Sequence, residues 1–359
     1  MSQRIIMFMP SIEGGGVEKN FFIVANYLIK FKDVSVITIS NKFKNKFNNK
    51  INFISPKSNF WDSFNRRFKY IFALILLINE FFKKKEKIVF CFQANIYAIL
   101  ICKLFSVKII VRSNSAPFGW SNSLIKKKIF KIILPFADKI MVNSYEFKKD
   151  IKKEFNVNSV CIYNPLNKKE IIKKSKNKIK KIYKNNILRI INIGRFTEQK
   201  DQLTLLKALN EIKNKITFQA IIIGRGVLKK KLDKYIDENN LNKFIKIKSF
   251  VKNPYPYIKQ SDIFILTSVY EGLPNVLLEA LVLNKFVISS DCRTGPKEIL
   301  LNGDGGYLFQ VGDYKKLSKL ILNYKINKKE CLGKLKKSRN HLFRFDYESN
   351  LRKYLDLLN

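Results

Sequence analysis

Residues 188–200 have the sequence LRIINIGRFTEQK. A short apolar run rich in β-branched residues ends at a glycine, and a helical pattern follows the loop. This order is typical of a strand, loop and helix in a parallel sheet. The N-terminus repeats it, with an apolar run over 4–10, a glycine-rich loop over 11–16 and a helical pattern over 17–29. Two such starts in 359 residues predict two domains.

Further apolar runs alternate with amphipathic stretches in both halves. Runs such as residues 88–92 are apolar throughout, which favours strands covered by helices on both faces. The predicted fold class is therefore α/β, with two Rossmann-like, doubly wound parallel sheets. Ligands bind outside the carboxyl ends of such strands, so the expected active site is a central cleft between the facing domains. The predicted strands cover residues 4–10, 34–40, 51–55, 87–93, 108–113, 139–144, 160–163, 188–194, 217–224, 245–250, 262–268, 285–290 and 306–309.

A lysine-rich segment marks the predicted domain boundary. Residues 168–184 contain nine lysines, one glutamate and few large apolar side chains, which indicates an exposed connection without a core. The sequence thus predicts a first domain over 1–167, a basic linker over 168–187 and a second domain over 188–338. Residues 339–359 are predicted as a C-terminal helix that packs back toward the first domain.

The composition limits the functional classes. Apolar residues make up 46% of the chain, which excludes general disorder. The net charge of +41 suggests a polyanionic partner, although a lysine-rich compositional bias explains it equally well. Five widely spaced cysteines indicate neither a disulfide framework nor a zinc site. No secretory signal is recognised, and the most apolar run, 70–82, is too short to span a bilayer. A cytoplasmic location is expected.

The first loop is a candidate phosphate site. Gly15 and Gly16 precede the helical pattern, and free N–H groups at a helix start favour phosphate. A structural tight turn explains these glycines about as well. The spacing does not match G-x-G-x-x-G, so a nicotinamide or flavin cofactor is disfavoured.

Two segments of the second half carry candidate charged groups. Arg195 and Lys200 follow a predicted strand and suit the neutralisation of a diphosphate, although two solvated basic residues are the alternative. Glu271 lies at another strand end and Glu279 lies inside the next helix, where carboxylates accept hydrogen bonds from sugar hydroxyls. The alternatives are a generic acidic loop and a solvent-facing helix glutamate. The N–H groups near Asn275 can meet phosphate.

Together these segments resemble the retaining glycosyltransferases of family 4 (glycosyl transferases group 1), which have the GT-B fold. The resemblance covers essentially the whole chain in order, which makes it specific although no single motif is. The matching segments are the E-x7-E of 271–279, the G-R-x4-K of 194–200, the glycine turn of 224–226 and residues 14–19, 137–144, 163–165 and 294–298.

The resemblance implies an enzyme that transfers a sugar with retention from a nucleotide-sugar, most often a UDP-sugar, without a cofactor or metal. No D-x-D sequence, the metal-binding signature of the other main architecture, occurs in the chain. By family analogy, Glu271 contacts sugar hydroxyls, Glu279 holds the ribose, and Arg195 and Lys200 neutralise the diphosphate. The implied donor-binding residues are Gly15, Gly16, Gly194, Gly224, Asn275, Val276, Leu277 and Glu279.

The chain departs from the family on the acceptor side. Many relatives place a histidine in the first domain, but the only histidine here is His341. The strand of 108–113 ends instead in Arg112-Ser113-Asn114, where Arg112 and Asn114 contact donor or acceptor or simply form a turn. Arg225 stands where relatives often have an acidic or neutral residue.

Two basic and apolar stretches, residues 66–77 and 124–134, suggest docking on the inner face of an anionic membrane. The alternative is a pair of core-facing helices with basic outer faces. Docking would fit a glycan or lipid-linked glycan acceptor in surface polysaccharide, lipopolysaccharide or glycoprotein-glycan synthesis. A nucleic-acid-binding protein is disfavoured because no binding module is recognised. A sugar-nucleotide epimerase or a phosphorylase on the same scaffold is the remaining alternative.

Overall fold

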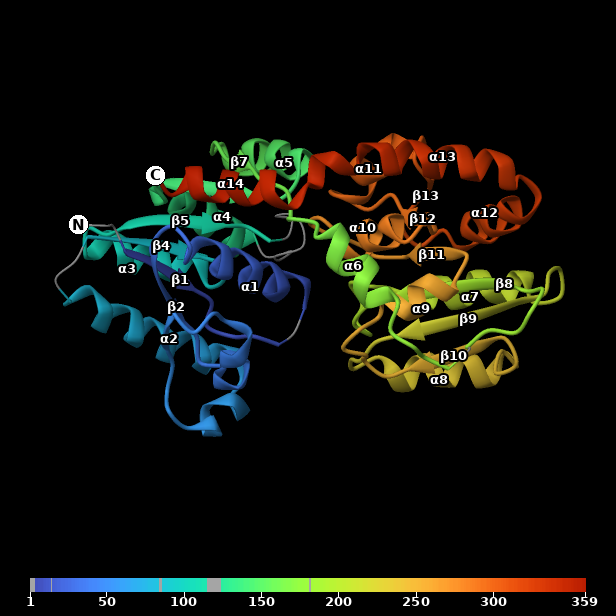
Figure 1. Ribbon diagram of the computed structural model, residues 1–359, viewed down its shortest axis with the longest axis horizontal. Coiled ribbons are helices and arrows are strands. Elements are labelled where there is room, and N and C mark those ends of the chain that lie inside the picture. The colour runs from blue at the N-terminus through green and yellow to red at the C-terminus, as the bar shows by residue number, and fades with distance from the viewer. Residues whose placement is uncertain (1–3, 14, 84–85, 115–123, 181) are drawn as a thin grey trace. The chain divides into compact units, whose positions relative to one another are not determined.

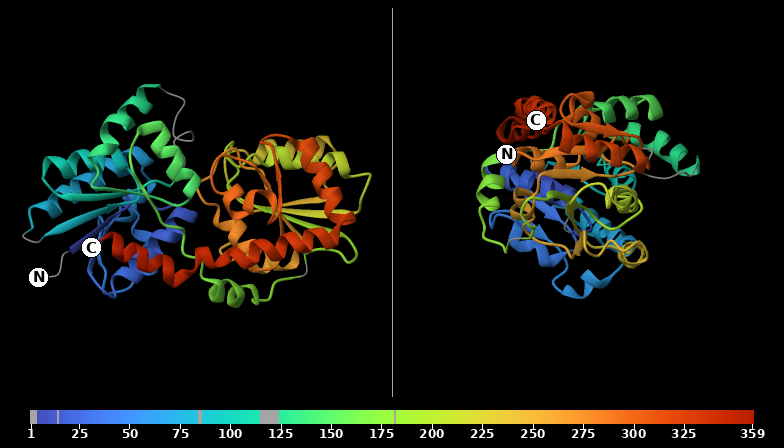
Figure 2. Two further views of the ribbon diagram at one scale, coloured as in Figure 1. Left: turned by 90° about the horizontal axis from the view of Figure 1, so that it is seen from above. Right: turned by 90° about the vertical axis from the view of Figure 1, so that its right-hand side faces the viewer.

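The computed structural model describes residues 4–13, 15–83, 86–114, 124–180 and 182–359. The chain divides into two compact units, Met1–Pro165 with Tyr347–Asn359, and Leu166–Asp346. Figures 1 and 2 show that a layer of strands with helices packed on it makes up each unit. Each unit is described by itself below.

The first unit contains a parallel sheet of seven strands in the order β3-β2-β1-β4-β5-β6-β7. Its strands are β1 (Arg4–Phe8), β2 (Asp33–Ile37), β3 (Asn52–Ile54), β4 (Lys87–Cys91), β5 (Lys108–Arg112), β6 (Lys139–Val142) and β7 (Val160–Cys161). Its helices are α1 (Gly16–Leu28), α2 (Arg66–Phe81), α3 (Asn95–Leu104), α4 (Leu124–Ile133), α5 (Tyr145–Phe155) and α14 (Tyr347–Leu357). The order reverses direction at β1 and β4, as in a doubly wound sheet.

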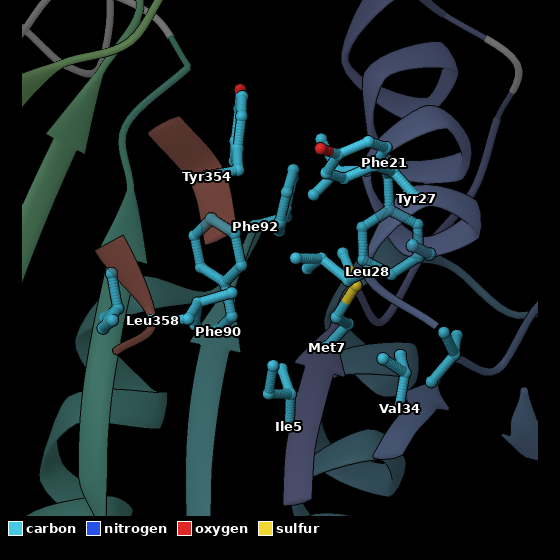
Figure 3. Close-up of a cluster of buried hydrophobic side chains, with 14 of the residues drawn as sticks. Ile5, Met7, Phe21, Tyr27, Leu28, Val34, Phe90, Phe92, Tyr354 and Leu358 are labelled. Carbon is cyan, nitrogen blue, oxygen red and sulfur yellow. The ribbon is translucent and has the colours of Figure 1, made fainter. Parts of the chain in front are cut away.

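The two faces of this sheet bury separate cores. On one face, Phe21 and Leu28 of α1 pack with Phe90 and with Tyr354 of α14, so the C-terminal helix completes the core of the first unit (Figure 3). On the other face, helices α2 to α5 cover the strands through side chains such as Ala73, Ile99 and Phe147. The central strands are therefore covered on both sides, as their apolar sequences require.

The second unit contains a parallel sheet of six strands in the order β10-β9-β8-β11-β12-β13. Its strands are β8 (Leu188–Ile193), β9 (Phe218–Ile223), β10 (Ile245–Lys248), β11 (Ile263–Leu266), β12 (Phe286–Ser290) and β13 (Tyr307–Phe309). Its helices are α6 (Lys168–Ser175), α7 (Gln202–Ile212), α8 (Lys229–Glu238), α9 (Tyr255–Gln260), α10 (Asn275–Val282), α11 (Pro296–Ile299), α12 (Tyr314–Ile326) and α13 (Lys328–Asn340). The predicted fold class of two doubly wound parallel sheets is confirmed.

The segment predicted as a basic linker differs from that prediction at its start. Residues 168–175 form α6, which belongs to the second unit, and Asn167 caps it by accepting a hydrogen bond from the backbone N–H of Glu170 at 2.9 Å. Ile171 of α6 is buried and the helix packs on α9 and α10. One buried isoleucine, together with the buried Ser175, is enough to dock a short helix whose lysines are mostly exposed.

Residues 339–359 were predicted as one C-terminal helix, but the structure divides them between the two units. Residues 341–345 form a short 3-10 helix within the second unit, whereas α14 lies in the first unit. In the part of the chain that the structure describes, no helix combines the length and the apolar character that crossing a membrane requires.

Candidate functional site

The polar groups of the second unit gather where β8 and β11 end. Residues 194–201 follow β8, and residues 267–274 follow β11, its neighbour in the sheet. The hydroxyl of Thr267 donates a hydrogen bond to the carbonyl of Lys200 at 2.9 Å, and the N–H of Val269 donates to the carbonyl of Gln199 at 2.8 Å. These contacts join the two loops into one structure.

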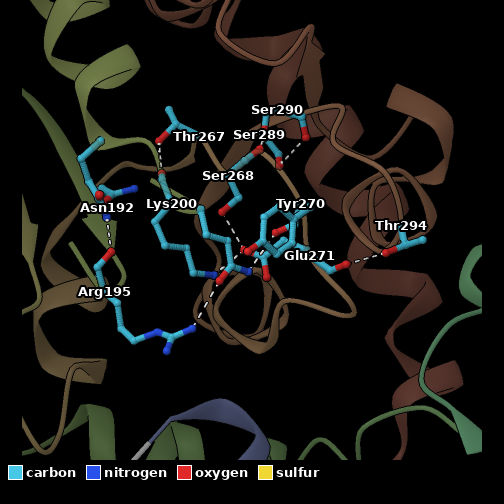
Figure 4. A network of polar contacts seen from close by, with 12 residues as sticks. Asn192, Arg195, Lys200, Thr267, Ser268, Tyr270, Glu271, Ser289, Ser290 and Thr294 are labelled. Carbon is cyan, nitrogen blue, oxygen red and sulfur yellow. Dashed lines mark hydrogen bonds and ion pairs between the residues drawn. The ribbon is translucent and has the colours of Figure 1, made fainter. Parts of the chain in front are cut away.

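Lys200 and Glu271 form an ion pair at the centre of this structure (Figure 4). Both side chains are largely buried. Ser268 donates its hydroxyl to the same carboxylate at 2.6 Å, and Thr294 donates to the backbone carbonyl of Glu271 at 2.6 Å. Lys200 and Ser268 thus hold the carboxylate, and Thr294 holds the backbone of the same residue. Such preorganisation is what a ligand-binding group needs.

Arg195 lies beside this pair but is exposed. Its guanidinium donates to the amide oxygen of Gln199 at 3.3 Å, and Gln199 donates in turn to the carbonyl of Tyr270 at 3.0 Å. Gln202 holds the backbone carbonyl of Arg195 at 3.0 Å. The structure therefore brings Arg195, Lys200 and Glu271 together, and an exposed arginine next to a lysine is suited to bind an anion.

Glu279 has a different environment, a little more than one turn into the helix that follows the loop. It is a buried residue of α10, not a solvent-facing one, and the hydroxyl of Tyr255 in α9 donates to its carboxylate at 3.1 Å. The start of α10 follows Pro274, with Asn275 and Val276 half-buried. Leu277 is fully buried, and its N–H bonds the carbonyl of Pro274, so its backbone donor is already used within the protein.

The glycines of the second unit allow the loops after β8 and β9 to touch. A Cβ atom on Gly224 would lie 1.9 Å from the carbonyl oxygen of Gly194 and 2.8 Å from the ring of Phe196. No side chain fits there, because real Cβ contacts are much longer. Gly224 therefore has a structural reason to be glycine, whether or not it also contacts a ligand. A Cβ atom on Gly194 would meet the side chains of Gln202 and Lys200 at ordinary or slightly short distances.

Arg225 extends from the same turn over an aromatic ring. Its guanidinium lies 5.0 Å from the ring centroid of Phe250, which follows β10 and is half exposed. Arginine and aromatic faces of this kind offer a flat surface on which a base can stack. Sequence reasoning singled out Arg225 and missed Phe250, whose position just after a strand end was the available signal.

Cys292 is a buried cysteine that interacts electrostatically with both members of the ion pair. Burial, with the negative charge of Glu271 as a further cause, raises the pKa of its thiol to about 12. Because the thiolate is the nucleophile, a thiol with this pKa is inert at neutral pH. Covalent catalysis through Cys292 is therefore disfavoured.

The candidate residues of the first unit have structural roles in what is described. Gly15 caps α1, and its N–H donates to the carboxylate of Glu18 at 2.9 Å. Gly16 is the first residue of α1, whereas Gly14 lies outside the described residues. The use of Gly15 and Gly16 in donor binding stays a prediction.

Arg112 is fully buried at the end of β5. It donates to the amide oxygen of Asn164 at 2.7 Å and lies 5.1 Å from the ring centroid of Phe92, while burial lowers the pKa of its guanidinium. Asn114 donates to the carbonyl of Phe92 at 2.7 Å. Both residues thus tie loops of the first unit together, in agreement with the structural alternative, and their contact with an acceptor stays a prediction.

Four further residues of the site were not found from the sequence. Ser268 and Thr294 fix Glu271, Gln199 joins Arg195 to the loop, and Tyr255 fixes Glu279. All four are neutral hydrogen-bonding residues outside the charged motif positions, so nothing in one sequence separates them from other polar residues.

Comparison with known proteins supports the resemblance. Residues 172–340, which lie in the second unit, match the model of the family described as "Glycosyl transferases group 1". The resemblance to group 1 glycosyl transferases is thereby confirmed. Nothing in the match extends to the residues of the first unit.

Two curated relatives and one solved structure are similar. An uncharacterized glycosyltransferase of Methanocaldococcus jannaschii is 34% identical over 65% of this chain and 61% of its own length. The N-acetylgalactosamine-N,N'-diacetylbacillosaminyl-diphospho-undecaprenol 4-alpha-N-acetylgalactosaminyltransferase of Campylobacter jejuni is 31% identical over 53% of this chain and 51% of its own length. The chain thus spans about half to three fifths of these relatives. Anabaena HepE in complex with UDP-glucose has a TM-score of 0.79 with 15% identity, covering 99% of both chains.

Proposed function

We propose that this protein is a retaining glycosyltransferase that uses a nucleotide-sugar, most often a UDP-sugar, as donor. The observation that carries the proposal is the paired Lys200 and Glu271 beside the exposed Arg195. Two cations suit a diphosphate, and a fixed carboxylate suits the hydroxyls of a sugar. The UDP-glucose complex of the Anabaena neighbour, which shares the fold, and the family match of the second unit support this choice.

In the proposed reaction, Arg195 and Lys200 neutralise the charge that grows on the diphosphate as the bond to the anomeric carbon breaks. The acceptor oxygen bonds to that carbon on the face from which the diphosphate leaves, and a phosphate oxygen takes the acceptor's proton. Glu271 holds the sugar, and Glu279, fixed by Tyr255, holds the ribose. Because side-chain cations meet the leaving group, the reaction is proposed to need no metal ion.

The proposed acceptor is a glycan or a lipid-linked glycan used for surface polysaccharide, lipopolysaccharide or glycoprotein-glycan synthesis, on the cytoplasmic face of a membrane. The Campylobacter relative supports a lipid-linked acceptor, since its name contains diphospho-undecaprenol, and an alpha linkage, which retention from an alpha-linked donor gives. The basic first unit supports an anionic membrane surface as the place of reaction.

A donor panel tests this proposal. The melting temperature Tm is measured with UDP-, GDP- and ADP-sugars, because a ligand that binds only the folded state raises Tm. At least one UDP-sugar is expected to raise Tm and to be consumed when an undecaprenyl-diphosphate-linked sugar is added, with the anomeric configuration retained in the product. No shift with any donor, or a product of inverted configuration, contradicts the proposal.

A further inference from the structure

Helices α2, α3 and α4 of the first unit expose apolar stripes on neighbouring surfaces. The three helices cover the same face of the sheet, and α3 packs against both α2 and α4. Half of all exposed large hydrophobic side chains among the described residues lie on these helices or at their C-terminal ends. We call this outward face the three-helix surface. Apolar exposure on this scale marks a binding surface in a folded protein.

Helix α2 has two apolar sides. Its inner side buries Ala73 and Leu77 in the core. Its outer side exposes Phe68, Ile71 and Ile75, and Ile71 is 55% exposed. The spacing of three and four residues places these outer side chains in one row along the helix. The row is apolar, not basic as in the alternative considered from the sequence.

Helix α3 repeats this arrangement and joins the other two helices. Ala98 and Cys102 face the core, while Tyr97, Leu100 and Leu104 face outward, again at helical spacing. Leu104 is 80% exposed. The sequence had indicated α2 and α4 as docking stretches, and α3 connects their exposed rows into one surface.

Helix α4 also exposes an apolar row. None of its residues is buried, and Ile125, Ile129 and Ile132 are exposed at helical spacing, with Ile125 72% exposed. Phe136, in the short 3-10 helix that follows, continues the row and is also exposed. Such side chains lose favourable free energy in water and gain it in an apolar environment.

The charges of the three helices are of one sign. Exposed basic residues flank the rows, including Arg67 of α2 and Lys128 and Lys131 of α4. The only carboxylate in these helices is that of Glu80, which is buried and bonded to Arg4 at 2.8 Å.

Two partly exposed carboxylates border the surface, where Glu13 pairs with Arg66 of α2 and Asp138 with Lys103 of α3. The helices themselves present apolar rows and positive charge, with no accessible carboxylate of their own. That combination complements an anionic bilayer, in which lipid headgroups meet lysines and acyl chains meet the apolar rows.

We propose that the three-helix surface docks on an anionic lipid bilayer with its helices lying in the plane of the interface. The inference rests on the proposed function in choosing a bilayer, the place of a lipid-linked acceptor, over another partner. A protein partner would require accessible carboxylates placed to match these lysines, whereas a bilayer of anionic lipids offers negatively charged phosphates without specific pairing. None of the three helices has to cross the membrane.

Vesicle flotation with the full-length protein tests the proposal. The wild type is expected to float with vesicles of phosphatidylglycerol and phosphatidylcholine but not with phosphatidylcholine alone. The variant Ile71→Ser/Leu104→Ser/Ile129→Ser removes one exposed side chain from each helix and is expected to lower the bound fraction at least tenfold. The variant Lys128→Gln/Lys131→Gln is expected to weaken the dependence on phosphatidylglycerol. Equal flotation of the wild type and the serine variant overturns the proposal.

A matched control sits in the second unit, where Val227, Ile326 and Leu332 are exposed apolar residues in separate elements. Their triple replacement by serine is expected to leave flotation unchanged, and an equal loss in this variant overturns the proposal. Another outcome also overturns the proposal: the wild type does not bind vesicles but forms dimers, and the variant Ile71→Ser/Leu104→Ser/Ile129→Ser does not form them. Transfer to a water-soluble acceptor is measured in parallel. Intact transfer without flotation contradicts only the docking, and intact flotation without transfer contradicts only the proposed function.

Discussion

Lys200 and Glu271 stand 71 residues apart in the chain and form a largely buried ion pair between the loops that follow β8 and β11. Each charge satisfies the other, so the pair keeps both groups ordered and neutral as a unit. Under the proposed function a diphosphate takes Lys200 and a sugar takes Glu271, and donor binding then has to separate the pair.

Removing either member of the pair is expected to abolish most transfer. Lys200→Met and Glu271→Gln should each lower kcat by about 100- to 1000-fold, the usual effect of losing one group that stabilises transition-state charge. The measurement is steady-state transfer with the donor identified by Tm shifts. Lys230→Met, an exposed lysine of α8, is the control and should retain wild-type kcat. Wild-type turnover in both pair variants would remove the site assignment.

Tyr255 is expected to act on donor affinity through Glu279. Tyr255→Phe removes the hydroxyl that bonds the buried carboxylate at 3.1 Å. A buried group that loses one hydrogen bond typically costs about 1–3 kcal/mol, so KM for the donor should rise about tenfold with kcat changed much less. Tyr257→Phe, two residues away and only half-buried, serves as the control. A loss confined to kcat would show that Tyr255 does not act through donor binding.

Gly224 should tolerate no side chain. Gly224→Ala places a Cβ atom on the carbonyl oxygen of Gly194 and is expected to destabilise the fold by about 3 kcal/mol. The comparison is Gly333→Ala in the exposed middle of α13, where a Cβ meets nothing within 4 Å. This second change should stabilise by about 1 kcal/mol. Urea unfolding measures both, and equal stabilities of the two variants would refute the predicted crowding.

The free energy of unfolding is expected to depend on pH through Lys285. Burial lowers the pKa of its ammonium group to about 8, with Asp262 acting in the opposite direction, and the group donates to the carbonyl of Ser261 at 2.7 Å. An unfolded lysine has a pKa of about 10.4. At pH values between these two pKa values, Lys285 is protonated more fully in the unfolded chain than in the folded chain. Its contribution to stability therefore rises as pH increases from 8 to 10.5.

The variant Lys285→Met removes this contribution. The unfolding free energy of the wild type should rise from pH 8 to 10.5 by on the order of 2 kcal/mol more than that of Lys285→Met, with allowance for partial solvent screening. Lys319→Met, at an exposed position of α12, should keep the wild-type slope. Urea unfolding at several pH values provides the data, and parallel slopes for wild type and Lys285→Met would contradict the assignment.

The strands were predictable because their signal is local. Continuous apolar runs such as 88–92 and 263–266 are short and rich in β-branched residues, which favours a strand covered on both faces, and every predicted strand lies where the structure has one. Helix α6 was missed because the sole large buried residue in its lysine-rich sequence is Ile171, and one buried side chain gives no periodicity.

The candidate site also contains residues that the sequence indicated and residues that it did not. Glycines and charged residues at strand ends, such as Lys200 and Glu271, were found because their chemistry and position coincide. Tyr255 was not found, because its only distinguishing property is its distance from Glu279 across two helices. The outer row of α3 was also missed. A helix with apolar residues on both sides has the sequence pattern of a helix that is buried all round.

Calorimetric titration of UDP and of the identified UDP-sugar tests the central claim most directly. Lys200→Met should weaken both ligands at least tenfold, because each carries the diphosphate. Glu271→Gln should bind UDP as tightly as the wild type or more tightly, since it releases Lys200 from the ion pair, yet lose the added affinity for the UDP-sugar. Wild-type affinity of Lys200→Met for UDP, or equal losses of both ligands in Glu271→Gln, would contradict the account.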